Sequence, residues 1–214
     1  GGVSGMGEDS KCVYTGTCLA GYTNPTPKGS DSAVNKRTII CSDCPANSYC
    51  PDGNTIPTSC STPYDKSGKN SKKQEDCYLT LNAGYYIPNA KDSPQSCPKG
   101  YKCPGGDTIH YGGTGGQTAC NNGYYQDETG QSDCKKCSVG TYTANDGKAY
   151  TACTGCPAGT YQDKEGQDGC IQCPKGTYQP NKKQTFCNKC KAGATTSGTG
   201  STEYKACLLT NETR

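Results

Sequence analysis

The chain has 214 residues, of which 30% are hydrophobic, with one Phe, one Met and no Trp against 29 Gly and 13 Pro. Once the 19 cysteines and 16 tyrosines are set aside, few aliphatic side chains remain, which excludes one large core and makes covalent crosslinks necessary. The net charge of +3 is spread over scattered lysines and acids, which excludes an extended basic surface for nucleic acid.

Cysteine makes up about 9% of the chain, a share typical of disulfide scaffolds, which persist only in oxidising compartments. We therefore expect a secreted protein that is extracellular or displayed on a cell surface. Residues 1–30 lack the apolar run of a signal peptide, so we interpret the chain as a mature or trimmed form. No apolar stretch approaches the roughly 20 residues of a membrane-spanning helix, so we expect no direct membrane span.

The cysteine pattern divides the chain into four parts. We expect a flexible N-terminal lead over residues 1–11, irregular cysteine-rich repeats over 12–119, regular cysteine-rich hairpin repeats over 120–207, and a tail over 208–214. Within the irregular part, Cys44-Pro-Ala-Asn-Ser-Tyr-Cys50 resembles Cys97-Pro-Lys-Gly-Tyr-Lys-Cys103. Both look like a variant of the regular unit with an added cysteine. We therefore interpret residues 12–119 as the modified half of one array and not as an unrelated domain.

In the regular part, pairs of cysteines with two residues between them recur every seventeen or nineteen residues. A short phrase follows the second cysteine, in Cys137-Ser-Val-Gly-Thr-Tyr142, Cys156-Pro-Ala-Gly-Thr-Tyr161 and Cys173-Pro-Lys-Gly-Thr-Tyr178. A nearly fixed period of this length is typical of a repeat array in which each unit mainly contacts its neighbours.

Each unit is predicted to be a short hairpin. Gly, Pro, Asn and Asp interrupt every stretch of about ten residues, and no window keeps a helical apolar period. The Thr-Tyr pairs at 160–161 and 177–178 favour strands, and polar turn sequences follow them. Gly140, Gly159 and Gly176 are expected to adopt a positive φ or to lie close to another backbone. The predicted fold class is small and disulfide-rich: a tandem array of short irregular β-hairpin repeats that forms an elongated ladder, with almost no helix.

The repeat narrows the choice of disulfides, although sequence alone does not fix their connectivity. A modular array is simplest when each unit closes on itself, which makes every Cys-x-x-Cys a junction between consecutive loops. A closed loop of about 15 residues contributes ~3 kcal/mol in the chain-entropy model. In the regular part we expect Cys120–Cys134, Cys137–Cys153, Cys156–Cys170, Cys173–Cys187 and Cys190–Cys207. In the irregular part we expect Cys77–Cys97 and Cys44–Cys60.

The phrase Cys-Pro-x-Gly-Thr-Tyr, followed by a polar loop and Cys-x-x-Cys, is similar to the ephrin-receptor-like and tumour-necrosis-factor-receptor-like cysteine-rich repeats of cell-surface proteins and surface antigens. The resemblance covers residues 120–207. It implies a disulfide ladder and supports Cys156–Cys170 and Cys173–Cys187 as first loops of their units. The chain lacks the full six-cysteine receptor domain, and its last unit has Gly193-Ala-Thr in place of Gly-Thr-Tyr.

Other chemistries have weaker support in the sequence. Cys134, Cys137, Cys153 and Cys156 have the spacing of a four-cysteine zinc site, but that interpretation leaves most other cysteines without a role. A redox Cys-x-x-Cys would need one reactive pair in a βαβ unit. His110 has no acid or nucleophile pattern around it, and we interpret it as a loop histidine. The acidic loops at 127–133 and 163–168 do not have EF-hand spacing. We expect no catalytic residue, no enzyme activity, no metal and no cofactor.

Nineteen cysteines cannot all pair within one chain, which indicates an intermolecular bond or a free thiol. Ten belong to the regular part, so the unpaired one is expected among Cys12, Cys18, Cys41, Cys44, Cys50, Cys60, Cys77, Cys97 and Cys103. We expect a homo-oligomer or homopolymer through the N-terminal half. A buried free thiol in a monomer and a partner cysteine outside these residues are the alternatives.

The interpretation that unites these features is an extracellular structural glycoprotein, a subunit of a surface stalk, coat or filament. Asn211, in Asn211-Glu-Thr213, is the predicted glycosylation site. The alternative is the ligand-binding ectodomain of a cell-surface receptor or adhesin, which would take a protein or glycan ligand.

Overall fold

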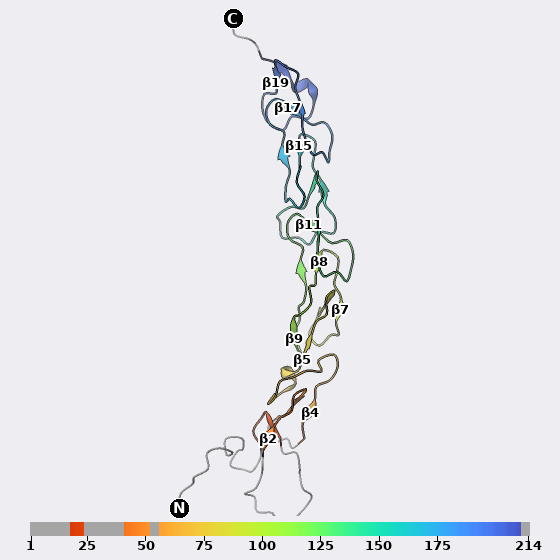
Figure 1. Cartoon of the computed structure of the whole chain (residues 1–214), viewed down its shortest axis with the longest axis vertical. Helices are drawn as coiled ribbons and strands as arrows, with labels where there is room; N and C mark the ends of the chain where they lie inside the picture. The colour runs from red at the N-terminus through yellow and green to blue at the C-terminus, as the bar shows by residue number, and fades with distance from the viewer. Residues whose placement is uncertain (1–17, 24–40, 52–55, 211–214) are drawn as a thin grey trace, which may run out of the picture. The chain divides into compact units, whose positions relative to one another are not determined.

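The computed structural model describes residues 18–23, 41–51 and 56–210, which form antiparallel pairs of very short strands (Figure 1). No α-helix occurs in these three ranges, where the helical turns are the 3₁₀ turns η2 (Gln74–Asp76) and η3 (Tyr204–Ala206). The predicted class, a disulfide-rich array of short hairpins, is therefore confirmed.

The chain divides into two compact units. The first comprises Gly1–Leu81, Tyr86–Gln95 and Gly106–Gly115, and the second comprises Asn82–Tyr85, Ser96–Gly105 and Gly116–Arg214. The division passes through β6 (Tyr85–Tyr86) and β7 (Gln95–Ser96), which pair with each other.

The first unit holds a small core. Tyr64, Cys77, Leu79, Leu81 and Ile87 are buried against one another. The Tyr64 ring meets Tyr111 edge-on at 5.5 Å, and its hydroxyl donates a hydrogen bond to the Asp92 carbonyl oxygen at 3.0 Å. Burial is the main cause that raises the pKa of the Tyr64 phenol. The strands of this unit pair as β1 (Tyr22–Thr23) with β2 (Ser42–Asp43), β3 (Ser48–Tyr49) with β4 (Thr58–Ser59), and β5 (Tyr78–Thr80) with β9 (Thr108–His110).

The second unit repeats one hairpin along the chain. Its strands are only two residues long, a length that is not stable without crosslinks and packing. They pair as β8 (Tyr101–Lys102) with β10 (Thr118–Ala119), β11 (Tyr124–Tyr125) with β12 (Lys135–Lys136), β13 (Thr141–Tyr142) with β14 (Thr154–Gly155), β15 (Thr160–Tyr161) with β16 (Ile171–Gln172), β17 (Thr177–Tyr178) with β18 (Asn188–Lys189), and β19 (Ala194–Thr195) with β20 (Leu208–Leu209).

These hairpins close with the same backbone hydrogen bond. The N–H of the residue after the second strand donates to the carbonyl oxygen of the glycine before the first strand. The donor is a cysteine, as from Cys156 to Gly140 at 2.9 Å, except in β19–β20, where Thr210 donates to Gly193 at 2.9 Å. Gly140, Gly159 and Gly176 have φ values of 75°, 78° and 85°, which confirms the expected positive φ. Side chains other than hydrogen are disfavoured there, so the repeated glycine sets the direction in which each hairpin leaves its junction.

Candidate functional site: disulfide junctions and hairpin stacking

The disulfide framework is the main chemical feature of the described residues. In the regular part, the structure joins the same five pairs that the repeat predicts, with Cα–Cα distances of 5.6 to 5.8 Å, within the usual range for disulfides. Each bond runs from the end of one hairpin to the start of the second strand of the next. The pairs are Cys120–Cys134, Cys137–Cys153, Cys156–Cys170, Cys173–Cys187 and Cys190–Cys207.

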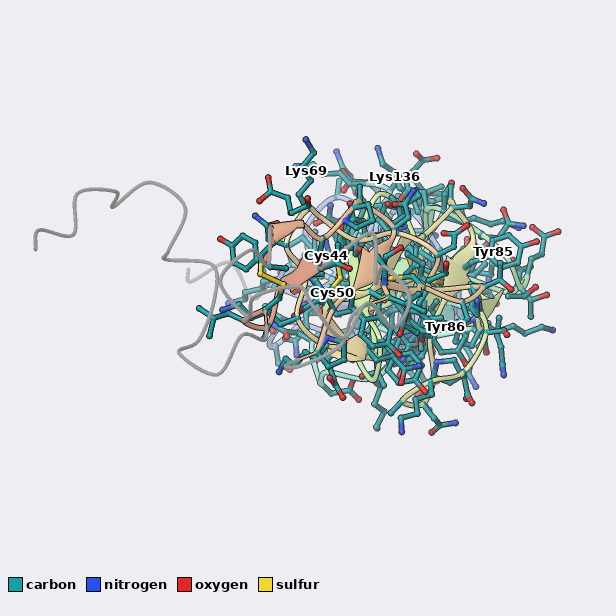
Figure 2. All side chains as sticks on the ribbon, turned by 90° about the horizontal axis from the view of Figure 1, so that it is seen from below. Cys44, Cys50, Lys69, Tyr85, Tyr86 and Lys136 are labelled. Carbon is teal, nitrogen blue, oxygen red and sulfur yellow. A yellow bond between two sulfur atoms is a disulfide. The ribbon has the colours of Figure 1, made fainter. Side chains whose placement is uncertain are left out.

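The two pairs expected in the irregular part are not the ones in the structure. Instead of Cys44–Cys60, Cys44 pairs with Cys50, six residues further on (Figure 2). Instead of Cys77–Cys97, Cys97 pairs with Cys103. The remaining pairs are Cys60–Cys77 and Cys18–Cys41.

The added cysteine explains this correction. In the regular hairpins, the partner of each junction cysteine lies three residues before the next one, as Cys170 lies before Cys173. Pro57 and Gln117 occupy that place before Cys60 and Cys120, so no partner is available there. The turn at Asn47 (φ 64°) and Gly100 (φ 83°) is the one that the regular hairpins make at their repeated glycine. The difference is the residue after the first strand, which is Cys50 or Cys103 here, and this residue bonds to the junction cysteine.

The nine disulfides use all eighteen cysteines of the described residues. The nineteenth, Cys12, lies outside the described residues, as does the predicted glycosylation site Asn211. Cys134, Cys137, Cys153 and Cys156, whose spacing would also suit zinc, take part in three of the nine bonds.

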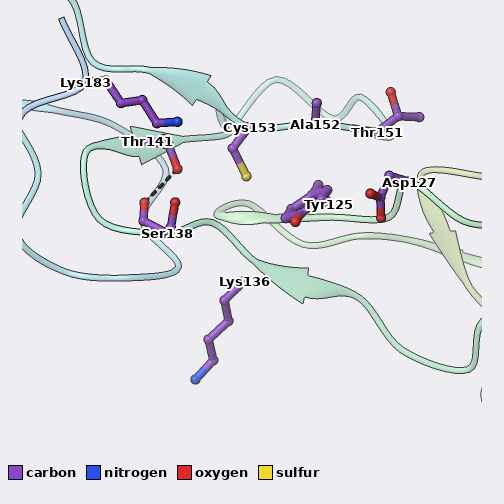
Figure 3. Close-up of a pocket in the computed structure, with 9 residues that line it drawn as sticks. All are labelled: Tyr125, Asp127, Lys136, Ser138, Thr141, Thr151, Ala152, Cys153 and Lys183. Atoms are coloured by element: carbon purple, nitrogen blue, oxygen red, sulfur yellow. Dashed lines mark hydrogen bonds between the residues drawn. The ribbon is translucent and has the colours of Figure 1, made fainter.

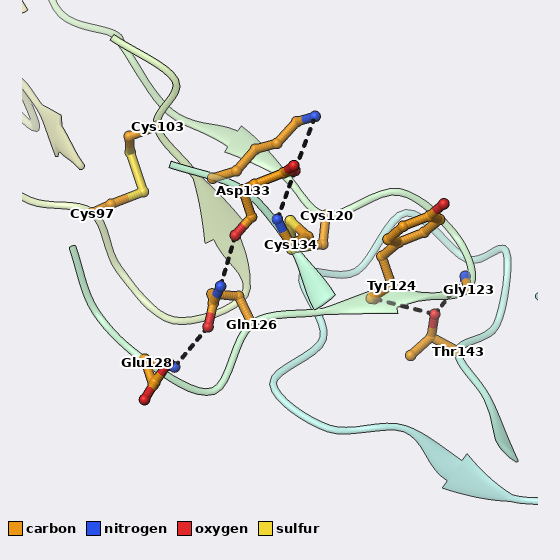
Figure 4. Close-up of a disulfide and its surroundings, with 11 residues drawn as sticks. Cys97, Cys103, Cys120, Gly123, Tyr124, Gln126, Glu128, Asp133, Cys134 and Thr143 are labelled. Atoms are coloured by element: carbon orange, nitrogen blue, oxygen red, sulfur yellow. Dashed lines mark hydrogen bonds and ion pairs between the residues drawn. A yellow bond between two sulfur atoms is a disulfide. The ribbon is translucent and has the colours of Figure 1, made fainter. Parts of the chain in front are cut away.

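Each hairpin of the second unit is hydrogen-bonded to the next. The N–H of Gly140 donates to the Gln162 carbonyl oxygen at 2.7 Å, and the N–H of Gly159 donates to that of Gln179 at 2.7 Å. The N–H of Gly123 has two acceptors in Thr143, the side-chain Oγ1 at 2.7 Å (Figure 4) and the carbonyl oxygen at 3.4 Å. The repeated glycine thus joins neighbouring hairpins as well as closing its own.

The same glycines also contact the turn of the hairpin two further along the chain. We call the turn between the two strands of a hairpin its loop tip. The N–H of Lys183, at the tip of β17–β18, donates to the Cys156 carbonyl oxygen at 2.7 Å, and a Cβ on Gly140 would lie only 2.7 Å from the Lys183 carbonyl oxygen. The same contact recurs for the tips at Gly130, Gly166 and Gly200, on Gly84, Gly123 and Gly159 respectively. The prediction that each unit mainly contacts its neighbours was therefore too narrow.

A buried polar side chain at one repeat position shapes these tips, and the sequence analysis missed it. The residue after the first strand is buried in each regular hairpin. In Gln162, the side-chain Nε2 donates to the Gly169 carbonyl oxygen at 2.9 Å and Oε1 accepts from the Lys164 N–H at 3.1 Å. Gln126 makes the equivalent bonds to Asp133 and Glu128 (Figure 4), and Gln179 makes them to Phe186 and Asn181.

The identity of this residue follows the loop length. Gln126, Gln162 and Gln179 occur where the disulfide spans 14 residues, whereas Thr143 and Thr196 occur where it spans 16 and 17. A glutamine can bond both sides of the shorter loop, while the shorter threonine side chain accepts the glycine N–H of the preceding hairpin. The signal in the sequence is a Gln or Thr three residues after the repeated glycine, whose identity is correlated with the cysteine spacing.

The remaining polar groups offer little chemistry. His110 lies in β9 and not in a loop, where its Nδ1 is 3.2 Å from the Glu75 carbonyl oxygen. Asp127 and Glu128 pair with Lys135 at 2.8 and 2.9 Å. The hydrogen bond that Lys135 donates to Asp127 lowers the pKa of the Asp127 carboxyl. The bonds that Lys135 donates to Asp127 and to Glu128 raise the pKa of Lys135. Within the described ranges, no cluster of His, Cys, Asp and Glu is arranged to bind a metal ion.

A shallow pocket of about 340 Å³ lies beside β13 and β14 (Figure 3). Its lining combines an aromatic ring, Tyr125, with the cations Lys136 and Lys183 and the polar side chains Asp127, Ser138, Thr141 and Thr151. This mixture suits a polar ligand better than a buried reaction, because it holds no nucleophile paired with a base.

Comparison with known families agrees with the repeat pattern. The model of the family described as "Tyrosine-protein kinase ephrin type A/B receptor-like" matches residues 106–150, 146–176 and 164–207. Residues 106–207 therefore consist of ephrin-receptor-like cysteine-rich repeats, and such disulfide-rich repeats indicate an extracellular protein. The match is to a cysteine-rich repeat and not to a catalytic domain, so an enzyme is not indicated.

No curated protein matches the chain. None of the helical segments in the described residues has the length and apolar character needed to cross a membrane.

Proposed function

Because residues 106–207 are ephrin-receptor-like repeats, and such disulfide-rich repeats indicate an extracellular protein, we propose that the protein is a structural subunit of a surface stalk, coat or filament. The observation that carries the proposal is the stacking pattern. Each regular hairpin is closed by its own disulfide, and the hairpins β11–β12, β13–β14 and β15–β16 are each hydrogen-bonded to the next two hairpins. Such an arrangement holds many small units in a fixed order without a large core, which is what a load-carrying array needs.

We further propose that the chain forms homo-oligomers or homopolymers through its N-terminal half. The support is parity: the described disulfides use eighteen of the 19 cysteines. The sulfur that remains belongs to Cys12, so an intermolecular bond would form near the start of the chain. Repeated head-to-tail contacts that do not close into a ring produce filaments.

The test is electrophoresis without reduction, combined with light scattering and with immunolabelling of the native protein at the cell surface. For a structural polymer, we expect a series of multimer bands on the gel and continuous labelling of the cell surface. The Cys12→Ser variant should reduce the size of the largest multimers. A strictly monomeric species with one alkylatable thiol would contradict the polymer.

The alternative function is a ligand-binding ectodomain. The pocket that contains Tyr125, Lys136 and Lys183 favours it, because aromatic rings and cations are common in sites for acidic or glycan ligands. Saturable binding of a protein or sulfated glycan that is lost in Lys136→Ala, by a protein that stays monomeric, would favour the ectodomain over the stalk.

A further inference from the structure

The tip of one regular hairpin carries a lysine where the tips of the other regular hairpins carry glycine. In each of them, the fifth residue after the first strand lies in the loop tip and has a positive φ. It is Lys183 in β17–β18, with φ 61°, and elsewhere it is Gly130, Gly147, Gly166 or Gly200, with φ of 68° to 76°. An L-residue is strained in this conformation and glycine is not. Strain of this kind is typical of residues that a binding site needs.

The strand residue beneath this tip differs in the opposite sense. Elsewhere a long side chain lies beneath a glycine tip, as Gln172 does beneath Gly200, 3.7 Å from its Cβ position. At the same strand position beneath Lys183 the residue is Gly155, and a Cβ there would lie 3.3 Å from the Lys183 Cβ and 3.6 Å from its Cγ. Gly155 therefore leaves room for the lysine side chain, which lines the pocket beside β13 and β14 (Figure 3).

The ammonium groups of the two lysines in this pocket have no partner in the part of the chain that the structure describes. Within residues 56–210, neither Lys183 nor Lys136 forms an ion pair or donates a side-chain hydrogen bond. By contrast, the tip lysine of β6–β7, Lys91 with φ 70°, places its Nζ 5.4 Å from the centroid of the Tyr111 ring. Two exposed cations are thus free to bind an anion from outside the chain.

The other groups that line the pocket suit a sugar ring. Figure 3 shows the half-buried Tyr125 ring between Lys183 at one end and Asp127 at the other. The C–H groups of a sugar pack on the negative face of an aromatic ring. The exposed hydroxyl groups of Ser138 and Thr151 form no hydrogen bond within residues 56–210 and can pair with sugar hydroxyls. A volume of about 340 Å³ lies at the lower end of the range for ligand pockets, so the ligand is small.

We propose that this pocket binds an acidic saccharide. Lys183 and Lys136 hold its acidic substituent, a sulfate or a carboxylate, and Tyr125 packs against the sugar ring. The Asp127 carboxylate accepts a sugar hydroxyl and repels the acidic substituent, which orients the ligand with its charge toward the lysines. The inference goes beyond the proposed structural role and does not depend on self-assembly, because a stalk or coat subunit can carry such a site as well.

The experiment is an NMR titration of the whole chain at low ionic strength. The probes are a sulfated disaccharide from heparin, a uronic acid disaccharide, neutral maltose and polyglutamate. We expect saturable shifts of the signals around Tyr125 with at least one acidic disaccharide, none with maltose, and weaker binding as salt is added. The comparison of the two acidic disaccharides shows whether a sulfate or a carboxylate is preferred.

Variants of the two lysines in the tip separate the site from general charge. Lys183→Met keeps the length of the side chain and removes its charge, and Lys183→Gly restores the residue found at the other regular tips. Both should weaken binding about threefold to tenfold. Lys183→Gly should also unfold at the same or a higher denaturant concentration, because it removes the backbone strain. Lys182→Met is the matched control, since Lys182 is an exposed neighbour in the same tip that does not line the pocket, and it should leave binding unchanged.

Tyr125→Leu tests the aromatic contact and should weaken binding of the acidic disaccharide, with denaturant unfolding as the check that the variant is folded. Equal losses in Lys182→Met and Lys183→Met would indicate a diffuse effect of charge and would overturn the site. Binding of polyglutamate that depends on Lys183 but not on Tyr125 would overturn the saccharide as the ligand. Failure of the native chain to bind either acidic disaccharide would also overturn the inference. Each of these results leaves the proposed structural role intact, since that role is decided by the multimers seen without reduction.

Discussion

Replacing Gly140 with alanine tests the stacking contact directly. At φ 75° any L-residue in place of glycine costs about 1–2 kcal/mol in backbone strain. The new methyl would also lie 2.7 Å from the Lys183 carbonyl oxygen, so the loop tip must move. This movement breaks two bonds that the tip makes, from the Lys183 N–H to the Cys156 carbonyl oxygen at 2.7 Å and from the Gln162 N–H to the Gln184 carbonyl oxygen at 3.0 Å, each contributing about 0.5–1.5 kcal/mol. We expect a total destabilisation of about 2–5 kcal/mol.

Gly147→Ala provides the matched control, because Gly147 has the same φ of 75° but no atom within 4 Å of its Cβ position. It should lose only the strain, about 1–2 kcal/mol. The free energies of unfolding of the two variants are compared by denaturant unfolding with the disulfides intact, and tyrosine fluorescence is the signal that monitors unfolding. Hydrogen exchange at the amide of Lys183 reports the local contact, since arrays do not always unfold in two states. Equal losses of stability with unchanged exchange at Lys183 would refute the stacking contact.

Three further predictions concern the disulfides, the buried glutamine and the ion pair of Asp127. Peptide mapping without reduction should find Cys156 joined to Cys170 and Cys97 joined to Cys103, and a peptide that links Cys153 to Cys156 would contradict the junctions. Gln162→Leu removes both bonds across its loop and should cost about 1–3 kcal/mol in the free energy of unfolding, whereas Gln167→Leu, which loses one exposed bond, should cost less than half as much. Because Lys135 lowers the pKa of Asp127 below its ordinary 3.8, the stabilisation from this pair is present above that pH and is lost as the pH falls further below it. Carboxyl NMR titration should show Lys135→Met raising the pKa of Asp127, and an unchanged pKa would refute the pairing.

The hairpins and their glycines could be predicted because their signals are local and repeated. A Gly three residues after a cysteine and a Thr-Tyr pair next to it define a turn and a strand within six residues, as at Cys156 to Tyr161. The cysteine period then gives the expected bond from Cys156 to Cys170, because a modular array is simplest when each unit closes on itself.

The contacts that the sequence analysis missed depend on geometry between hairpins. Nothing in the local sequence of Gly140 indicates that Lys183, 43 residues later, lies over it. The pairing of Cys44 was missed for a different reason. The added Cys50 alone does not favour the bond between residues six apart. It does so only together with Pro57, which stands where a regular hairpin has the partner cysteine.

Contacts between each hairpin and the hairpin two further along the chain change how the array responds when one disulfide is reduced. The disulfide Cys156–Cys170 closes the loop whose tip, at Gly166, lies on Gly123 and donates to the Cys137 carbonyl oxygen at 2.8 Å. Reduction of this bond frees the tip and therefore exposes the glycine of an earlier hairpin, β11–β12, in addition to loosening β15–β16 itself. In an array held only by nearest-neighbour contacts, damage would spread one unit at a time. Here a hairpin that has lost its docked tip still keeps its hydrogen bond to the adjacent hairpin, as Gly123 keeps its bond to Thr143, so one reduced disulfide weakens the array without dividing it.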